Sequence, residues 1–334
     1  MNISVTLRHI RLFFSLSIAL LPAACSDATP GMGDGEEETI PGRAIVFSTE
    51  STHTRASQIS QMRGESFGVK AFILNNRWAS AGYNAKTDAN WNNVAVSCNL
   101  SGICSYSPRQ VWTDDEYYSF FGYYPHTDAS ISVSDANHES TPYIEYRPSA
   151  NDPTLHRDVM VASLLDCTST STGQVRLRFS HVLFCINLAV NNYNDEAILL
   201  EEVTCHFTSP LYSTYRINMN KSNPTPDGSI SNAEYLMVNS RNVPNTATTG
   251  AVNITDDDRY LMLIPQKGLK GKISFFITQN GQRAYKEVEF DDSDTEFRAG
   301  YRYTCALYFV GAAINFRIIQ NNEWTDNDSH IEFD

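Results

Sequence analysis

The chain has 334 residues, 42% of them hydrophobic, and a formal net charge of −13. This acidic balance excludes an ordinary nucleic-acid-binding protein, which needs a basic surface, and disfavours peripheral binding to anionic lipid head groups. The length exceeds that of a typical single domain and indicates two.

The N-terminus has the pattern of a lipoprotein signal peptide. Two arginines precede an apolar run, Leu12 to Ala24, which stops at Cys25. The run is shorter than the roughly 20 apolar residues of a membrane-spanning helix, so residues 1–24 are predicted to be a cleaved export signal. Cys25 would then be acylated and would anchor the protein to a membrane through lipid alone. Because Pro22 stands where a lipobox usually has leucine, an ordinary signal-peptidase cut before Cys25 is the alternative.

Residues 25–55 are predicted to form an acidic tether followed by one removable strand. Glycine, proline and like charges dominate residues 26–42, whereas residues 44–49 have the composition of an isolated strand. Arg55 follows in a polar segment, where a trypsin-like protease cuts easily. Such a cut would detach the strand and leave a groove that a strand from another molecule could fill. An ordinary first strand followed by a surface loop is the alternative.

The body of the chain reads as all-β, because short apolar segments alternate with clusters of turn-forming residues. Residues 67–74 are the first strand of this body. The segment 117–124 is apolar on both faces, so it is expected to be central or to lie beneath another element. The alternative is an exposed aromatic platform for glycans.

The segment 166–174 resembles a linker and divides the chain into an N-terminal sandwich, 56–172, and a C-terminal one, 173–334. Apolar residues alternate along 175–179, and the alternation shifts by one position after His181. This shift indicates a bulge or a crossing between sheets. Asn280 and Gly281 predict a two-residue hairpin turn.

Six cysteines follow Cys25, and export permits disulfides. Cys98 and Cys104 flank a short loop that a disulfide could close, with two free thiols as the alternative. The remaining cysteines read as small buried hydrophobic residues. The sequence lacks catalytic motifs and cysteine or histidine pairs with metal-ligand spacing, so no catalytic residue, metal or cofactor is expected.

Several short motifs share their order and spacing with one protein family. They are residues 45–49, 54–56, 67–72, 118–125, 158–162, 177–183, 263–265, 297–303 and Trp324. With these motifs, the chain from Cys25 to Trp324 resembles the fimbrillin (Mfa-like) family, whose members are lipoprotein subunits of type V pili.

This resemblance implies two tandem transthyretin-like Greek-key β-sandwich domains and a place in a fimbrium at the outer membrane. It also implies lipidation at Cys25 and removal of residues 44–49 by an Arg-specific protease. Arg55 is the preferred cleavage site, with Arg43 and Arg63 as alternatives. A C-terminal segment of a neighbouring subunit would then fill the vacated groove.

The position within a pilus stays open at this point. The residues after Trp324 are few for a donor strand, although Ile331 and Phe333 alternate, so tip, ancillary and anchor subunits fit as well as a stalk subunit. The competing hypothesis is a monomeric surface lipoprotein that binds a host or glycan ligand through an aromatic face. A secreted hydrolase has no supporting motif.

Overall fold

The computed structural model describes residues 43–51, 62–81, 89–134, 141–170 and 174–321. These ranges all belong to one compact unit, residues 41–334. The described residues form β-strands and a single 3-10 turn, Pro153–Leu155, which confirms the all-β prediction. The described ranges contain no helix of the length and apolarity that crossing a membrane requires.

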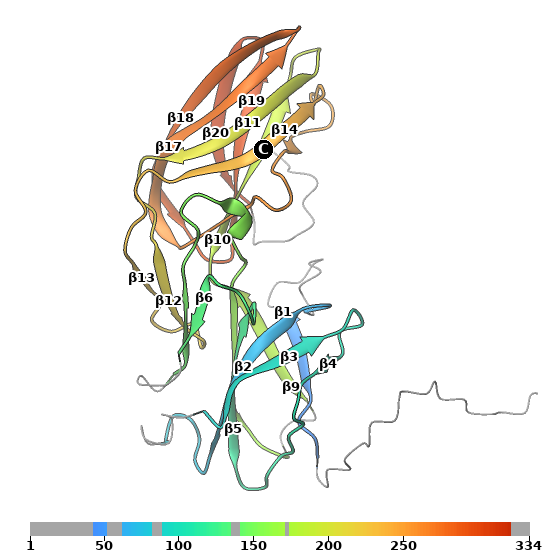
Figure 1. The fold of residues 1–334 in the computed structure, drawn as a ribbon, viewed down its shortest axis with the longest axis vertical. Helices are drawn as coiled ribbons and strands as arrows, with labels where there is room; N and C mark the ends of the chain where they lie inside the picture. The colour runs from blue at the N-terminus through green and yellow to red at the C-terminus, as the bar shows by residue number, and fades with distance from the viewer. Residues whose placement is uncertain (1–42, 52–61, 82–88, 135–140, 171–173, 322–334) are drawn as a thin grey trace, which may run out of the picture. The chain divides into compact units, whose positions relative to one another are not determined.

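The N-terminal part of the body is built on a seven-stranded sheet (Figure 1). Its order is β1 (Phe47–Ser51), β9 (Val175–His181), β8 (Met160–Cys167), β5 (Tyr117–Tyr124), β2 (Ser66–Leu74), β3 (Trp91–Cys98) and β4 (Cys104–Ser105). The β1 strand pairs with β9 in parallel, and the other neighbours in the sheet are antiparallel. Phe47 at one edge contacts Tyr106, directly after the strand at the other edge, so the sheet curls around one hydrophobic core.

The outer face of this sheet packs on a second sheet. The second sheet has the order β13 (Thr225–Asp227), β12 (Thr214–Asn218), β7 (Tyr143–Tyr146) and β6 (Ile131–Val133). Phe121 and Tyr123 of β5 lie in the core between the two sheets, whereas Tyr118 and Phe120 face the curled core. All four side chains are buried. The interpretation of 117–124 as a strand buried on both faces is confirmed, and the alternative of an exposed aromatic platform is wrong.

The C-terminal part is a sandwich of two further sheets. One contains β15 (Val252–Asn253), β10 (Phe184–Asn192), β19 (Arg302–Val310) and β20 (Ala313–Gln320), with β16 (Leu261–Leu263) also on β10. The other has the order β14 (Glu234–Val243), β11 (Ile198–Phe207), β17 (Gln266–Gln279) and β18 (Gln282–Phe297). Buried side chains from both sheets share one core. The change of apolar phase after His181 is a crossing between sheets, because β9 ends there and β10 begins in another sheet.

Sheet membership does not follow the chain in two simple blocks. The β9 strand completes the seven-stranded sheet, and β12 and β13 extend the sheet that contains β6 and β7. The chain therefore returns to the N-terminal layers after the predicted linker. The division of the chain at 172/173 stays a prediction.

The β17–β18 hairpin closes with the turn expected from its sequence. Asn280 and Gly281 have φ values of 52° and 72°, and Gln279 pairs with Gln282. Both positive φ values belong to the type I′ turn, which follows the twist of the strands. At Gly271, in the interior of β17, a Cβ atom would lie 2.0 Å from the carbonyl oxygen of His206 in β11. Close approach of two backbones therefore requires glycine at this position.

We expect Gly271→Ala to destabilise the protein much more than Gly281→Ala. The added methyl group at 271 forces β11 and β17 apart, which should cost more than about 3 kcal/mol. At Gly281 a Cβ meets no atom within 4 Å, so only the left-handed backbone conformation is penalised, by about 1–2 kcal/mol. Chemical denaturation of the two variants measures the difference. Equal losses of stability would contradict the steric explanation.

A buried histidine joins the C-terminal and N-terminal layers. The backbone N–H of Met262 donates to His156 Nδ1 at 3.0 Å, so the neutral ring carries its proton on Nε2 and donates it to the carbonyl of Ser149 at 3.0 Å. Tyr235 packs edge-on against the ring and donates its hydroxyl proton to the same carbonyl. Burial lowers the pKa of His156 to about 4, because the imidazolium would lose its hydration.

Because the pKa of His156 is lowered in the fold, we expect the free energy of unfolding to decrease in acid. The pKa of His156 lies at 6.5 when unperturbed and near 4 in the fold, so between these values the unfolded chain binds the extra proton. Its contribution to stability should be complete above pH 6.5 and should fall as the pH drops towards 4. Denaturation midpoints measured between pH 4 and pH 6.5 test this dependence of stability on pH. His156→Gln keeps one acceptor and one donor but cannot titrate, so an unchanged pH slope in that variant would contradict the assignment.

Candidate strand-accepting groove

The first strand lies along the edge of the seven-stranded sheet. Residues Phe47 to Ser51 pair in register with Val175 to Phe179 of β9. The pairing continues before the strand, since the N–H of Val175 donates to the carbonyl of Val46 at 2.7 Å. In Figure 1, β1 is the blue strand beside β9. This edge of the sheet therefore depends on residues that come directly after the N-terminal tether.

A second wall holds the strand from the opposite side. The N–H of Ile45 donates to the carbonyl of Gln110 at 2.9 Å, and the hydroxyl of Tyr106 donates to the carbonyl of Ile45 at 2.9 Å. The N–H of Trp112 donates to the carbonyl of Arg43 at 3.0 Å. Residues 43–51 thus lie in a groove between β9 and the segment 106–112, which we call the β1 groove.

Alternate side chains of this segment fill the β1 groove. Ile45 and Phe47 are each 2% exposed and Thr49 is buried, whereas the intervening Val46 is 40% exposed. Phe47 lies at the centre, with ring centroids 5.4–6.3 Å from four aromatic neighbours. These neighbours are Phe67, Trp91, Tyr106 and Phe120. The contacts are edge-to-face, a geometry that adds to the stabilisation from buried area.

The sequence-predicted processing residues are placed only in part. Cys25 and Arg55 lie outside the described residues. Of the alternative cleavage sites, Arg63 is exposed, and Arg43 donates a hydrogen bond to the carbonyl of Ser169 at 2.7 Å. The segment 44–49, predicted as an isolated strand, is the one that occupies the groove. Sequence reasoning missed the wall 106–112, because it has no strand periodicity and only Tyr106 and Trp112 indicate burial.

The predicted cysteine pair lies at the far edge of the same sheet. Cys98 of β3 and Cys104 of β4 are directly paired, and the structure joins them as a disulfide. Asn99 Oδ1 closes the loop by accepting from the N–H groups of Ser101 and Ile103, at 2.9 and 3.0 Å.

The other described cysteines are buried and are not disulfide-bonded: Cys167, Cys185, Cys205 and Cys305. Burial raises the pKa of the Cys205 thiol to about 12, so this group stays protonated and behaves as a hydrophobic side chain. Within the described ranges, no three His, Cys, Asp or Glu side chains converge as a metal site would require.

Comparison with known proteins agrees with this architecture. A fimbrillin-like family model matches residues 54–324. A fimbrial protein from Bacteroides vulgatus superposes with a TM-score of 0.66 at 20% identity, over 85% of this chain and 100% of the other. A candidate cell adhesion protein from Bacteroides ovatus gives 0.52 at 15% identity, over 85% and 98% of the two chains.

At these identities the two structures establish a shared fold alone. A search of curated proteins finds no match. The family model, in contrast, matches most of the chain, including β2, β5 and the C-terminal sandwich. The protein is a member of the fimbrillin-like family.

Proposed function

We propose that the protein is a non-catalytic subunit of a cell-surface pilus that contributes to adhesion. In this proposal β1 occupies its groove only until the subunit assembles. The observation that carries it is the burial of Ile45 and Phe47 between β9 and the segment 106–112, in a chain of the fimbrillin-like family. The shared fold with a Bacteroides fimbrial protein supports the same function.

The contacts of β1 are of a kind that another strand can reproduce. The hydrogen bonds of residues 43–46, directly before β1, with Val175, Gln110 and Trp112 run through the backbone and need no particular side chain in the donor. Specificity comes from alternate apolar side chains, with one large group required at the position of Phe47. A donor strand with this alternation would restore both, as in other cases of strand addition.

An emptied groove would drive assembly. Loss of residues 43–51 would leave the N–H groups of Val175 and Trp112 without their present partners. It would also expose the rings of Phe67, Trp91 and Phe120, which β1 now covers. Burying this apolar surface again contributes a favourable hydrophobic term of about 25 cal/mol per Å², which opposes the entropic cost of association.

The remaining steps rest on the sequence. Cys25 would carry the lipid that holds the precursor at the outer membrane, and an Arg-specific protease would cut after Arg55. This cut would release the anchor together with β1, because both precede it in the chain. Neighbouring subunits would be the partners. The subunit could take a stalk, tip or ancillary position.

Arg55→Ala should block maturation and multimer formation on the native cell surface. We expect the wild-type protein to begin at Ala56 and to form ladders of multimers, because the cut empties the groove. Intact mass and N-terminal sequencing of the recovered protein measure this. Arg43→Ala and Arg63→Ala are matched controls that should still be processed. An acylated Cys25 start in the wild-type protein, with the whole chain present, would contradict the proposal.

Phe47→Ala should destabilise the uncut chain by about 3–5 kcal/mol, the usual cost of removing a buried phenylalanine side chain. Val46→Ala, directly before β1, truncates a side chain that is 40% exposed and should change stability by less than about 0.5 kcal/mol. Thermal and chemical denaturation of the uncut chain compare the two variants. Similar values for both would show that the β1 groove holds its strand without help from the aromatic cluster.

A further inference from the structure

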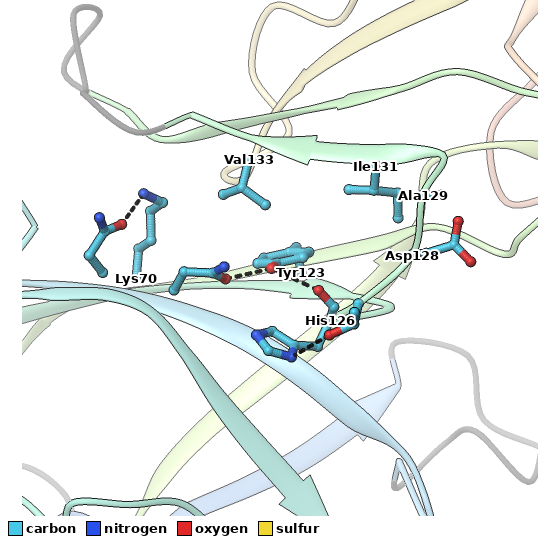
Figure 2. Close-up of a pocket in the computed structure, with 10 residues that line it drawn as sticks. Lys70, Tyr123, His126, Asp128, Ala129, Ile131 and Val133 are labelled. Atoms are coloured by element: carbon cyan, nitrogen blue, oxygen red, sulfur yellow. Dashed lines mark hydrogen bonds between the residues drawn. The ribbon is translucent and has the colours of Figure 1, made fainter.

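A cavity of about 680 Å³ opens on the outer face of the seven-stranded sheet, beside β6. Figure 2 shows Ile131 and Val133 of β6 pointing across it towards Tyr123 of β5 and Lys70 of β2. The lining residues are Lys70, Asn92, Asn93, Tyr123, His126, Thr127, Asp128, Ala129, Ile131 and Val133. We call this cavity the β6 pocket. It belongs neither to the β1 groove nor to the strand exchange proposed above.

A β-bulge supplies part of the polar wall. Val69 pairs with Val94, but the next paired residue of β2, Ala71, lies opposite Trp91, so two residues of β3 oppose Lys70 alone. These two residues are Asn92 and Asn93, and both line the pocket. Asn93 has a φ of 59°, the left-handed conformation that strains most residues. Bulges of this kind redirect side chains, and strained backbone is concentrated at functional sites.

Lys70 and Tyr123 extend the polar wall. Lys70 is only 3% exposed and donates from Nζ to Asn92 Oδ1. The ring of Tyr123 lies against Gly68, where a Cβ would approach within 2.1 Å, so glycine is required for the ring to lie there. The Tyr123 hydroxyl is within hydrogen-bonding distance of Asn93 Oδ1 and of the carbonyl of His126. Burial raises the pKa of Tyr123 to about 12, so this hydroxyl stays a neutral donor.

The wall retains hydrogen-bonding capacity for a ligand. Among the described residues, the Nδ2 groups of Asn92 and Asn93 have no partner, and both side chains are exposed. The buried Nε2 atom of His126 also has no hydrogen-bond partner among the described residues. Asp128 is an acidic group whose charge is compensated by Arg157 at 2.8 Å. The hydrogen bonds from Ser130 and the charge of Arg157 lower the pKa of Asp128 despite its partial burial.

The opposite wall is apolar. It consists of Ala129, which precedes β6, and of Ile131 and Val133, which lie in β6. The pocket therefore presents the exposed amides of Asn92 and Asn93 and the hydroxyl of Thr127 on one side, and aliphatic groups on the other. A sugar ring has the matching two-sided chemistry, with hydroxyl groups around its edge and C–H groups on its faces. The volume lies within the usual range for small-molecule sites and leaves room for a short oligosaccharide.

We propose that the β6 pocket is a carbohydrate-binding site, with the exposed amides of Asn92 and Asn93 as hydrogen-bonding groups and Ile131 and Val133 as the apolar wall; the buried Tyr123 hydroxyl positions Asn93. This gives the subunit a glycan-binding activity that does not depend on its assembly. The sugar would bind at the margin of the layer between the two N-terminal sheets, and not on the buried aromatic face of β5.

The test uses the purified chain with residue 55 intact and an array of short oligosaccharides containing glucose, galactose, mannose, fucose, N-acetylhexosamines and sialic acid. The strongest binder is then titrated by calorimetry. Asn93→Gly removes the amide while keeping a residue that accepts positive φ, so it should raise Kd about tenfold. Ala129→Trp places an indole in the pocket from an exposed position and should abolish binding.

Asn232→Gly is the matched control, because Asn232 is an exposed residue with a φ of 54° that does not line the pocket. It should bind as the wild-type protein does. Absence of binding to every member of the array would overturn the proposal, as would wild-type affinity in both pocket variants. Neither result would bear on pilus assembly. Assembly is tested separately, by sequencing the N-terminus of the protein recovered from the cell surface.

Discussion

The seating of residues 43–51 in the β1 groove is the contact on which the N-terminal layers depend. Phe47 fills the space among four aromatic rings, and one of them, Tyr106, directly follows the strand at the opposite edge of the curled sheet. A single strand near the start of the chain therefore completes the core that β2, β3, β5, β8 and β9 share. A core completed in this way is sensitive to any change that detaches the strand. The same sensitivity suits the proposed strand exchange, in which β1 would leave the groove when the subunit assembles.

The two faces of the β5 strand belong to different cores. Phe120 faces inward and touches Phe47, whereas Phe121 and Tyr123 face outward into the layer beneath β6, β7 and β12. The proposed strand exchange and the proposed carbohydrate site thus use opposite faces of one strand. Because each face has its own set of contacts, a change in the groove does not require any change in the β6 pocket. Such a separation lets a subunit bind a ligand before and after it joins a pilus.

The C-terminal sandwich contributes a separate core. The β10 strand lies between β19 and the short strands β15 and β16, and its side chains are buried throughout. The thiols of Cys205 and Cys305 lie in this core, where burial raises their pKa values. Backbone contact at Gly271 brings β11 and β17 close together, and the hydrogen bonds of His156 with Ser149 and Met262 join these layers to the N-terminal ones.

Local patterns in the sequence determined the strands and several of their details. Alternation placed the two faces of 117–124 correctly, Asn280 and Gly281 specified the hairpin turn, and the phase change after His181 located a crossing between sheets. These features depend on neighbouring residues, whose φ preferences and alternating side chains are visible in any short segment.

Tertiary structure alone decided which strands meet. The pairing of residues 47–51 with 175–179 joins segments far apart in the chain, and the wall at 106–112 carries no strand periodicity. The β6 pocket likewise arises from a bulge opposite Lys70 and from a strand of another sheet. Short-range propensities contain no information about such long-range partners, so the groove and the pocket became visible only when the sheets were assembled.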